Sequence, residues 1–125
     1  MRDQSSLTGT IIGGAMEVHR ALGPGLLETA YCTCLYHELR QRGLKVRKEV
    51  PLPLSYKGVH LDAGYRLDLV VEGSVIVEVK AVERVHPVAY AQVLTYLRLT
   101  GIRLGLLINF NTQFLRTGIR RVVSG

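Results

Sequence analysis

The sequence predicts an α/β or α+β domain in which helices flank a mixed central β-sheet. Three observations lead to this fold class. Helical periodicity fills the first third of the chain, strand-like alternation fills the middle third, and a further helix separates two apolar strand-like runs. The predicted order is two helices, five short strands, a helix and a strand, with a last strand candidate at the C-terminus. A single domain over residues 1–125 fits this length.

Two helices are expected before the first strand. Apolar residues recur at helical spacing over 5–21, where Ser5 or Ser6 is the candidate N-cap. Gly23-Pro24-Gly25 ends this helix. The second helix is expected over 26–42, and the glycine that follows it is a typical helix stop.

Short strands are expected on both sides of the third helix. Before it, residues 44–50 alternate between apolar and basic side chains, and a Lys57-Gly58 turn joins two further short runs. The helix begins at Pro87 and ends at a glycine. After it, the apolar run 103–110 is typical of a buried strand, and 119–123 is the last strand candidate. A helix between two such strands favours a right-handed parallel crossover.

The segment from Asp68 to Lys80 is the most informative part of the chain. Two apolar runs flank a Glu72-Gly73-Ser74 turn, which predicts a β-hairpin. The same runs contain the charged residues Asp68, Glu78 and Lys80. Because burying unpaired charge is costly, we expect these groups to have partners, and a metal ion and a phosphate are suitable ones.

The length of the turn decides whether the carboxylates of Asp68 and Glu78 meet. A two-residue turn pairs Val71 with Ser74, which sets the carboxylates apart. A three-residue turn pairs Val71 with Val75, which sets them directly opposite each other. We expect the three-residue register because it gathers six apolar side chains on one face, and that face is then core while the opposite face carries the charges. The six are Leu67, Leu69, Val71, Val75, Val77 and Val79.

Composition and charge limit the classes of function. The formal net charge of +6 and the pI of about 9.7 favour a polyanionic partner. No apolar run approaches the ~20 residues of a membrane span, and residues 1–6 lack the apolar segment of a signal peptide. We therefore expect a cytoplasmic protein without membrane contact. Two basic groups are open to either solvated surface or nucleic-acid contact: Arg40, Arg42, Lys45, Arg47 and Lys48, and Arg116, Arg120 and Arg121.

The cysteines and histidines do not suggest a metal site. Cys32 and Cys34 lie two apart in an expected helix, so they do not face each other, and two thiols alone make a poor zinc site. We expect both to be reduced and structural. The four histidines show no metal-ligand spacing and are expected to be structural or exposed.

Two further polar pairs are expected on helices. Glu28 and Tyr31 lie three apart early in the second helix, and Gln92 and Tyr96 lie four apart on the third, so each pair shares a helix face. Each pair has an ordinary explanation, since a first-turn carboxylate complements the helix dipole and a polar pair suits a helix surface. Their combination with the charged hairpin points instead to one site.

This ensemble resembles the PD-(D/E)xK nuclease superfamily, in particular its branch of RecB-type and lambda-exonuclease-type enzymes. Within that superfamily the chain is similar to the GxxExxY protein family. The resemblance covers roughly residues 5–123 and departs where relatives often carry His-Glu, since this chain has Ala89 and Tyr90. The segments that carry it are Gly25-Leu26-Leu27-Glu28-Thr29-Ala30-Tyr31, Asp68-Leu69-Val70-Val71, Val77-Glu78-Val79-Lys80-Ala81, Ala91-Gln92-Val93-Leu94-Thr95-Tyr96-Leu97 and Gly105-Leu106-Leu107-Ile108-Asn109-Phe110.

The resemblance implies a restriction-endonuclease-like core and a nuclease that hydrolyses phosphodiester bonds with Mg²⁺, for which Mn²⁺ can substitute. The implied metal ligands are Asp68, Glu78 and the backbone carbonyl of Val79, with Glu28 as a further ligand, directly or through water. The implied partner is nucleic acid, with DNA favoured over RNA, and a homodimer is a candidate assembly.

The resemblance also assigns roles beside the metal. Lys80 would orient the attacking water or stabilise the developing negative charge. Gln92 would position Lys80 or contact the phosphate. Tyr31 and Tyr96 would support these groups by packing or by hydrogen bonds.

The competing interpretation is a nucleic-acid-binding or protein-interaction module that retains the nuclease fold without activity. A short chain with no obvious extra domain to hold DNA favours this alternative. The presence of all of Asp68, Glu78 and Lys80 favours the enzyme. A module that only binds would show salt-dependent affinity but no magnesium requirement.

Overall fold

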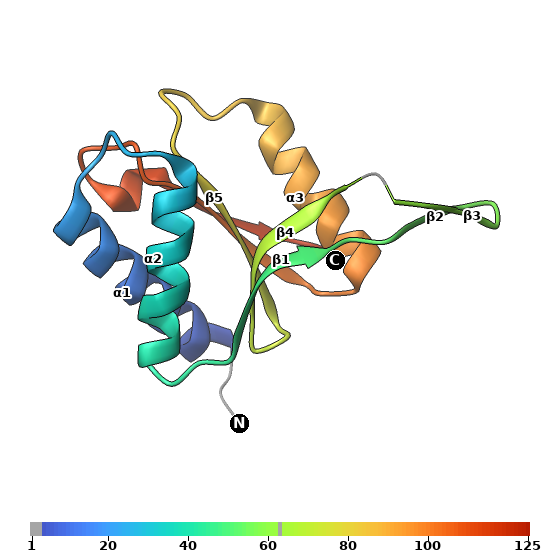
Figure 1. Ribbon diagram of the computed structural model, residues 1–125, viewed down its shortest axis with the longest axis horizontal. Coiled ribbons are helices and arrows are strands. Elements are labelled where there is room, and N and C mark those ends of the chain that lie inside the picture. The colour runs from blue at the N-terminus through green and yellow to red at the C-terminus, as the bar shows by residue number, and fades with distance from the viewer. Residues whose placement is uncertain (1–3, 63) are drawn as a thin grey trace.

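The computed structural model describes residues 4–62 and 64–125 (Figure 1). The predicted element order is confirmed. The elements are α1 (Gln4–Leu22), α2 (Glu28–Gln41), β1 (Val46–Pro51), β2 (Leu54–Tyr56), β3 (Val59–Leu61), β4 (Arg66–Val71), β5 (Val75–Lys80), α3 (Pro87–Thr100), β6 (Leu104–Asn109), the 3₁₀ helix η1 (Leu115–Gly118) and β7 (Ile119–Val123).

A five-stranded mixed sheet in the order β1-β4-β5-β6-β7 forms the centre of the fold. Strands β5 and β6 are parallel and are joined by α3, as the predicted crossover requires, whereas the other neighbours are antiparallel. Figure 1 shows α1 and α2 on one face of this sheet and α3 on the other. The fold class is therefore the predicted one, an α+β domain whose mixed sheet is flanked by helices and is consistent with a restriction-endonuclease-like core.

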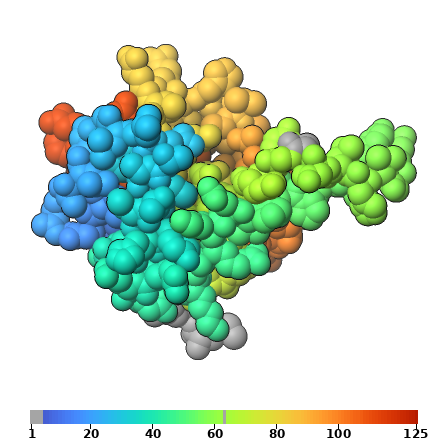
Figure 2. All heavy atoms as spheres, viewed as in Figure 1, coloured from blue at the N-terminus to red at the C-terminus, as the bar shows by residue number. Residues whose placement is uncertain are grey.

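Strands β2 and β3 form a separate two-stranded sheet. Together they make an arm that projects from the body of the molecule (Figures 1 and 2). Tyr56, Val59 and Leu61 on this arm are all exposed. The arm leaves the main sheet at β1 and returns to it at β4, so its base adjoins the strand that contains Asp68.

The β4–β5 hairpin is buried on both faces, and the expectation of a single core face was wrong. Val70 and Ile76 pack in a second core cluster with Val93 and Leu97, because α3 covers this face of the sheet. Leu67 belongs to this second cluster too, and not with Leu69 as predicted. The change of side falls at the residue between these two leucines, which is Asp68.

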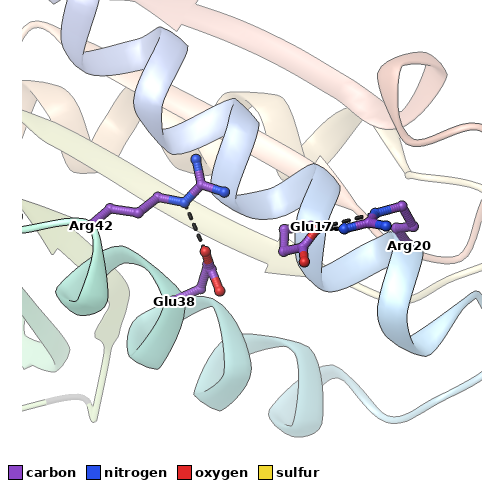
Figure 3. Close-up of polar contacts among 4 residues, drawn as sticks. All are labelled: Glu17, Arg20, Glu38 and Arg42. Carbon is purple, nitrogen blue, oxygen red and sulfur yellow. Dashed lines mark hydrogen bonds and ion pairs between the residues drawn. The ribbon is translucent and has the colours of Figure 1, made fainter.

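Helix α1 packs closely against α2 at Gly14. A Cβ added there would lie 2.7 Å from Leu39 Cδ2, so a glycine permits the approach. The two ion pairs of the described residues lie within α1 and at the end of α2: Arg20 with Glu17, and the C-cap residue Arg42, through Nε, with Glu38 Oε2 at 2.8 Å (Figure 3). Each pair joins residues close together in the sequence, and neither involves the charged hairpin.

The beginning of α1 differs from the prediction. Gln4, the first residue that the structure describes, is already helical, so Ser5 and Ser6 lie within the helix and neither is its N-cap. The residue before Gln4 lies outside the described residues. None of the helices in the described ranges is long and apolar enough to cross a membrane.

Candidate functional site

The β4–β5 hairpin has the predicted three-residue register. Val71 pairs with Val75, Val70 with Ile76, and Leu69 with Val77. A turn with positive φ at Glu72 (54°) and Gly73 (63°) permits this register. Continuing the same register by one residue sets Asp68 opposite Glu78.

At Asp68 and Glu78, hydrogen bonds between side chains and backbone amides replace the regular backbone pairing of β4 with β5. The Asp68 N–H donates to Glu78 Oε1 at 3.2 Å, and the Val79 N–H donates to Asp68 Oδ2 at 2.8 Å. Each carboxylate is thus oriented by a backbone amide of the opposite strand. The two carboxyl groups also share a hydrogen bond between their side chains. A cation that binds between them would therefore replace the proton of that bond.

Burial and mutual repulsion perturb the titration of this carboxylate pair. Glu78 is only 5% exposed, whereas Asp68 is half-buried. Burial first, then the charge of Asp68 and a hydrogen bond with its side chain, raise the pKa of Glu78 to about 9; the hydrogen bond from the Asp68 N–H and the charge of Lys80 oppose this rise. Without a cation, the pair therefore retains a proton at neutral pH.

Lys80 lies at the end of β5, where Asn109 supports the chain. The Lys80 carbonyl accepts from the Phe110 N–H at 2.8 Å. Asn109 is 4% exposed; its Oδ1 accepts from the Val82 N–H at 3.1 Å and its Nδ2 donates to the Val82 carbonyl at 2.9 Å. The role of Asn109 was not predicted, although a polar amide at the end of the apolar run 103–110 was a usable signal. Asn109 acts as a positioning residue for the segment that follows Lys80.

Helix α2 brings Glu28 towards Asp68. Both residues line a hollow of about 80 Å³, together with Cys32, Lys48 and Glu49. Burial raises the pKa of Glu28, the charge of Lys80 opposes this rise, and the charge of Asp68 adds to it. Glu28 therefore interacts electrostatically with both Asp68 and Lys80 of the hairpin.

Tyr31 has a structural role at the beginning of α2. Its hydroxyl donates to the Gly23 carbonyl at 2.5 Å and accepts from the Leu26 N–H at 3.1 Å. Its ring is fully buried and stacks on Phe110, with 4.7 Å between ring centroids. Tyr31 thus anchors the loop before α2 and thereby sets where Glu28 begins the helix.

Helix α3 brings Tyr96, but not Gln92, to the carboxylate pair. Burial first, and then the negative charge of Glu78, raise the pKa of Tyr96 to about 12, with smaller contributions from Tyr65 and Asp68. Gln92 is exposed, and among the described residues no hydrogen bond joins it to Lys80. The structure thus gives no contact for the predicted Gln92–Lys80 interaction.

The remaining predicted groups are close to expectation. Both cysteines are free thiols, and burial, as the largest cause, raises the pKa of Cys32 to about 12, so this thiol is a poor nucleophile.

Two of the histidines make structural hydrogen bonds. His86 caps α3 by accepting from the Val88 N–H at 3.1 Å. His19 Nε2 lies 2.7 Å from the Thr112 carbonyl oxygen. Lys48, from the first basic group, lies 4.9 Å from the centre of the Tyr36 ring.

The donor set fits a magnesium ion held by few protein ligands. Within 4–62 and 64–125, no group of three or more His, Cys, Asp or Glu side chains is arranged to hold a metal ion. Mg²⁺, however, keeps several waters and is usually bound by one or two carboxylates plus substrate phosphates. Asp68 and Glu78 supply two adjacent carboxylates, and the proton that they retain is what a cation would replace.

Comparison with known proteins identifies the family. A family model that describes the PD-(D/E)XK nuclease superfamily matches residues 5–122, a range that contains all the candidate site residues. Neither the curated proteins nor the solved structures that were compared include a match to this chain. The match covers more than half of the chain, and the chain therefore belongs to the PD-(D/E)XK nuclease superfamily.

Proposed function

We propose that this protein is a metal-dependent nuclease that hydrolyses phosphodiester bonds, with DNA as its substrate. One observation carries the proposal: Asp68 and Glu78 face each other where β4 and β5 lose regular pairing, and Lys80 follows on the same strand. Membership of a nuclease superfamily supports the same reaction. The net charge of +6 suits a polyanionic substrate.

In this proposal Asp68 and Glu78 hold Mg²⁺, or Mn²⁺ in its place. The Val79 carbonyl and Glu28, directly or through water, are the further ligands. A bound divalent cation lowers the pKa of a water molecule and polarises the scissile phosphate. Lys80 contributes a fixed positive charge that orients the attacking water or stabilises the charge that develops on the phosphate.

The helical residues have supporting roles in the proposal. Tyr96 packs on the face of the sheet that Glu78 shares with α3, and Gln92, which is exposed, contacts the substrate instead of positioning Lys80. The Gly25–Tyr31 segment, with its anchoring tyrosine, supports assignment to the GxxExxY family within the RecB-like branch. A homodimer would give two such sites, one for each strand of a duplex.

A nuclease assay with matched variants tests the proposal. Wild type, Glu78→Gln, Lys80→Ala and the control Glu83→Gln, which alters an exposed loop carboxylate, are incubated with single- and double-stranded DNA and RNA. Each reaction contains Mg²⁺, Mn²⁺ or a chelator. We expect cleavage only with the cation, its loss in the first two variants and its retention in Glu83→Gln. Cleavage that survives both Glu78→Gln and Lys80→Ala would rule out the mechanism.

The second candidate function is nucleic-acid binding without cleavage. It is supported by the net charge of +6, which attracts a polyanion whether or not that polyanion is cleaved. In that case the affinity would fall with salt, because phosphate contacts release counterions. Neither chelator nor Asp68→Ala would change the affinity, and no cleavage would accompany binding.

A further inference from the structure

A second hollow lies beside the candidate site, on the face of the sheet that α3 covers. It has a volume of about 190 Å³ and is called here the tyrosine pocket. Figures 1 and 2 show that α3 borders the base of the projecting arm, where this pocket lies. The residues that line it include Leu52, Leu54, Tyr65, Gln92, Tyr96 and Leu99.

The tyrosine pocket adjoins the carboxylate pair through Tyr96. This residue lines the pocket and packs in the same core cluster as Leu67 and Ile76, which lie just before Asp68 and Glu78 on β4 and β5. The charges of Glu78 and Asp68 also act on its hydroxyl group. A base held in the pocket would therefore lie close to a phosphate at Glu78. Tyr65, which also lines the pocket, has no role in the proposed phosphodiester cleavage.

The shape and chemistry of the pocket suit a nucleobase. The rings of Tyr65 and Tyr96 meet edge to face, with centroids 6.5 Å apart and planes at 63°. Leucine side chains form much of the remaining wall, while the exposed amide of Gln92 offers hydrogen bonds. The volume is below the roughly 300–1,000 Å³ typical of sites for drug-sized ligands, so one ring system is a better fit. A nucleobase combines apolar faces with a polar edge.

Tyr65 is held in place while its ring remains accessible. Its carbonyl accepts from the Leu52 N–H at 3.0 Å and from Arg66 Nη1 at 2.9 Å. The residue is nevertheless 43% exposed. Arg66 is exposed and takes part in neither ion pair of the described residues, so its charge is available to a phosphate. The backbone of Tyr65 is thus held by two hydrogen bonds, while its ring and the Arg66 side chain are both exposed.

We infer that the tyrosine pocket receives an unpaired nucleobase next to the phosphate at Glu78, and that the substrate is DNA with a single-stranded segment. The cleavage part rests on the proposed function, whereas base binding stands on the pocket alone. In a duplex the bases are stacked and paired, so a base enters such a pocket only after unstacking. Aromatic stacking tolerates any sequence, because every base has a π-face.

A stacking assay without divalent cations tests this inference. A short single-stranded oligonucleotide carrying 2-aminopurine, whose fluorescence is quenched by stacking, is titrated with protein up to about 100 µM, the weak end of non-specific DNA binding. The same sequence as a duplex is the second substrate. The variants are Tyr65→Ala, Tyr65→Phe and the control Tyr56→Ala, which removes another exposed tyrosine from the arm, outside the pocket.

We expect Tyr65→Ala to weaken single-strand binding about 5- to 150-fold, the range for loss of one base–aromatic stack, and to abolish quenching. Tyr65→Phe keeps the ring and should bind like wild type, as should Tyr56→Ala. Duplex binding should change much less. No single-strand binding by wild type, an equal loss on duplex, or unchanged binding by Tyr65→Ala would each overturn the inference.

The assay separates the inference from the proposed function. Cleavage that depends on Asp68, combined with unchanged single-strand binding by Tyr65→Ala, would refute only the base pocket. Quenching that depends on Tyr65, combined with no cleavage under any condition, would refute only the nuclease. The latter result would leave a single-strand-binding domain.

Discussion

The titration of Glu78 predicts an unusual dependence of stability on pH when divalent cations are removed. In the unfolded chain this carboxyl loses its proton near its ordinary pKa, whereas in the folded protein its pKa is about 9. A raised pKa of an acid means that protonation favours the fold. The contribution to stability is therefore complete at low pH and is lost as the pH rises towards about 9.

The magnitude follows from the linkage of one proton to folding. Between the unfolded and folded pKa values, the free energy of unfolding falls by up to about 1.4 kcal/mol per pH unit. From pH 6 to pH 8 the loss is therefore up to about 2.7 kcal/mol. For a domain of this size, each kcal/mol of unfolding free energy changes the Tm by about 3–6 °C. The Tm should therefore fall by at most about 8–16 °C between pH 6 and pH 8.

The assay is thermal unfolding, followed by circular dichroism in chelator over this pH range, for wild type, Glu78→Gln and the control Glu83→Gln. Glutamine cannot ionise, and its carbonyl oxygen still accepts a hydrogen bond from the Asp68 N–H. We therefore expect Glu78→Gln to lose most of the pH dependence, while Glu83→Gln follows wild type. A wild-type Tm that does not fall between pH 6 and pH 8, or an equal slope in Glu78→Gln, would refute the reasoning.

Three further predictions follow from contacts of the same fold. Adding Mg²⁺ at pH 8 should raise the Tm of wild type by ligand linkage but leave Asp68→Ala unchanged in the same melting assay, and an equal shift in both would place the cation elsewhere. Gly14→Ala should be less stable than Gly9→Ala by about 1–3 kcal/mol in urea unfolding, because only the former meets Leu39, whereas nothing lies within 4 Å of a Cβ at Gly9. Tyr31→Phe should lower the free energy of unfolding by about 1–3 kcal/mol, since two hydrogen bonds to the loop before α2 are lost while the stacked ring stays, and a change below about 0.5 kcal/mol would contradict the anchoring role.

Much of the fold could be predicted because its signals are local. The Glu72-Gly73-Ser74 turn and the alternation of valines specify the hairpin register, and that register alone puts Asp68 opposite Glu78. Pro87 at the beginning of α3 and Gly101 at its end, which has φ of 78°, mark the helix in the same way. In each case the physical cause lies within a few residues of its effect.

The candidate site was less accessible to prediction where distant elements meet. The spacing of Gln92 and Tyr96 predicted that they share one helix face. Only the packing of α3 on the sheet shows that both line the tyrosine pocket and that Tyr96 also interacts electrostatically with Glu78. The contact of Asn109 with Val82 joins segments on either side of α3. No periodicity or motif spacing reports such contacts.

By itself, the sequence determined the order of the elements, the hairpin register and the resemblance to the PD-(D/E)xK superfamily. Only the tertiary structure decided that both faces of the hairpin are buried, that Leu67 lies on the side opposite to Leu69, and that a tyrosine pocket adjoins the carboxylates. Turn chemistry and strand alternation act between neighbours along the chain. Burial, and the pKa of Glu78 that follows from it, depends on which helix covers which face, and that is settled only when the whole sheet packs.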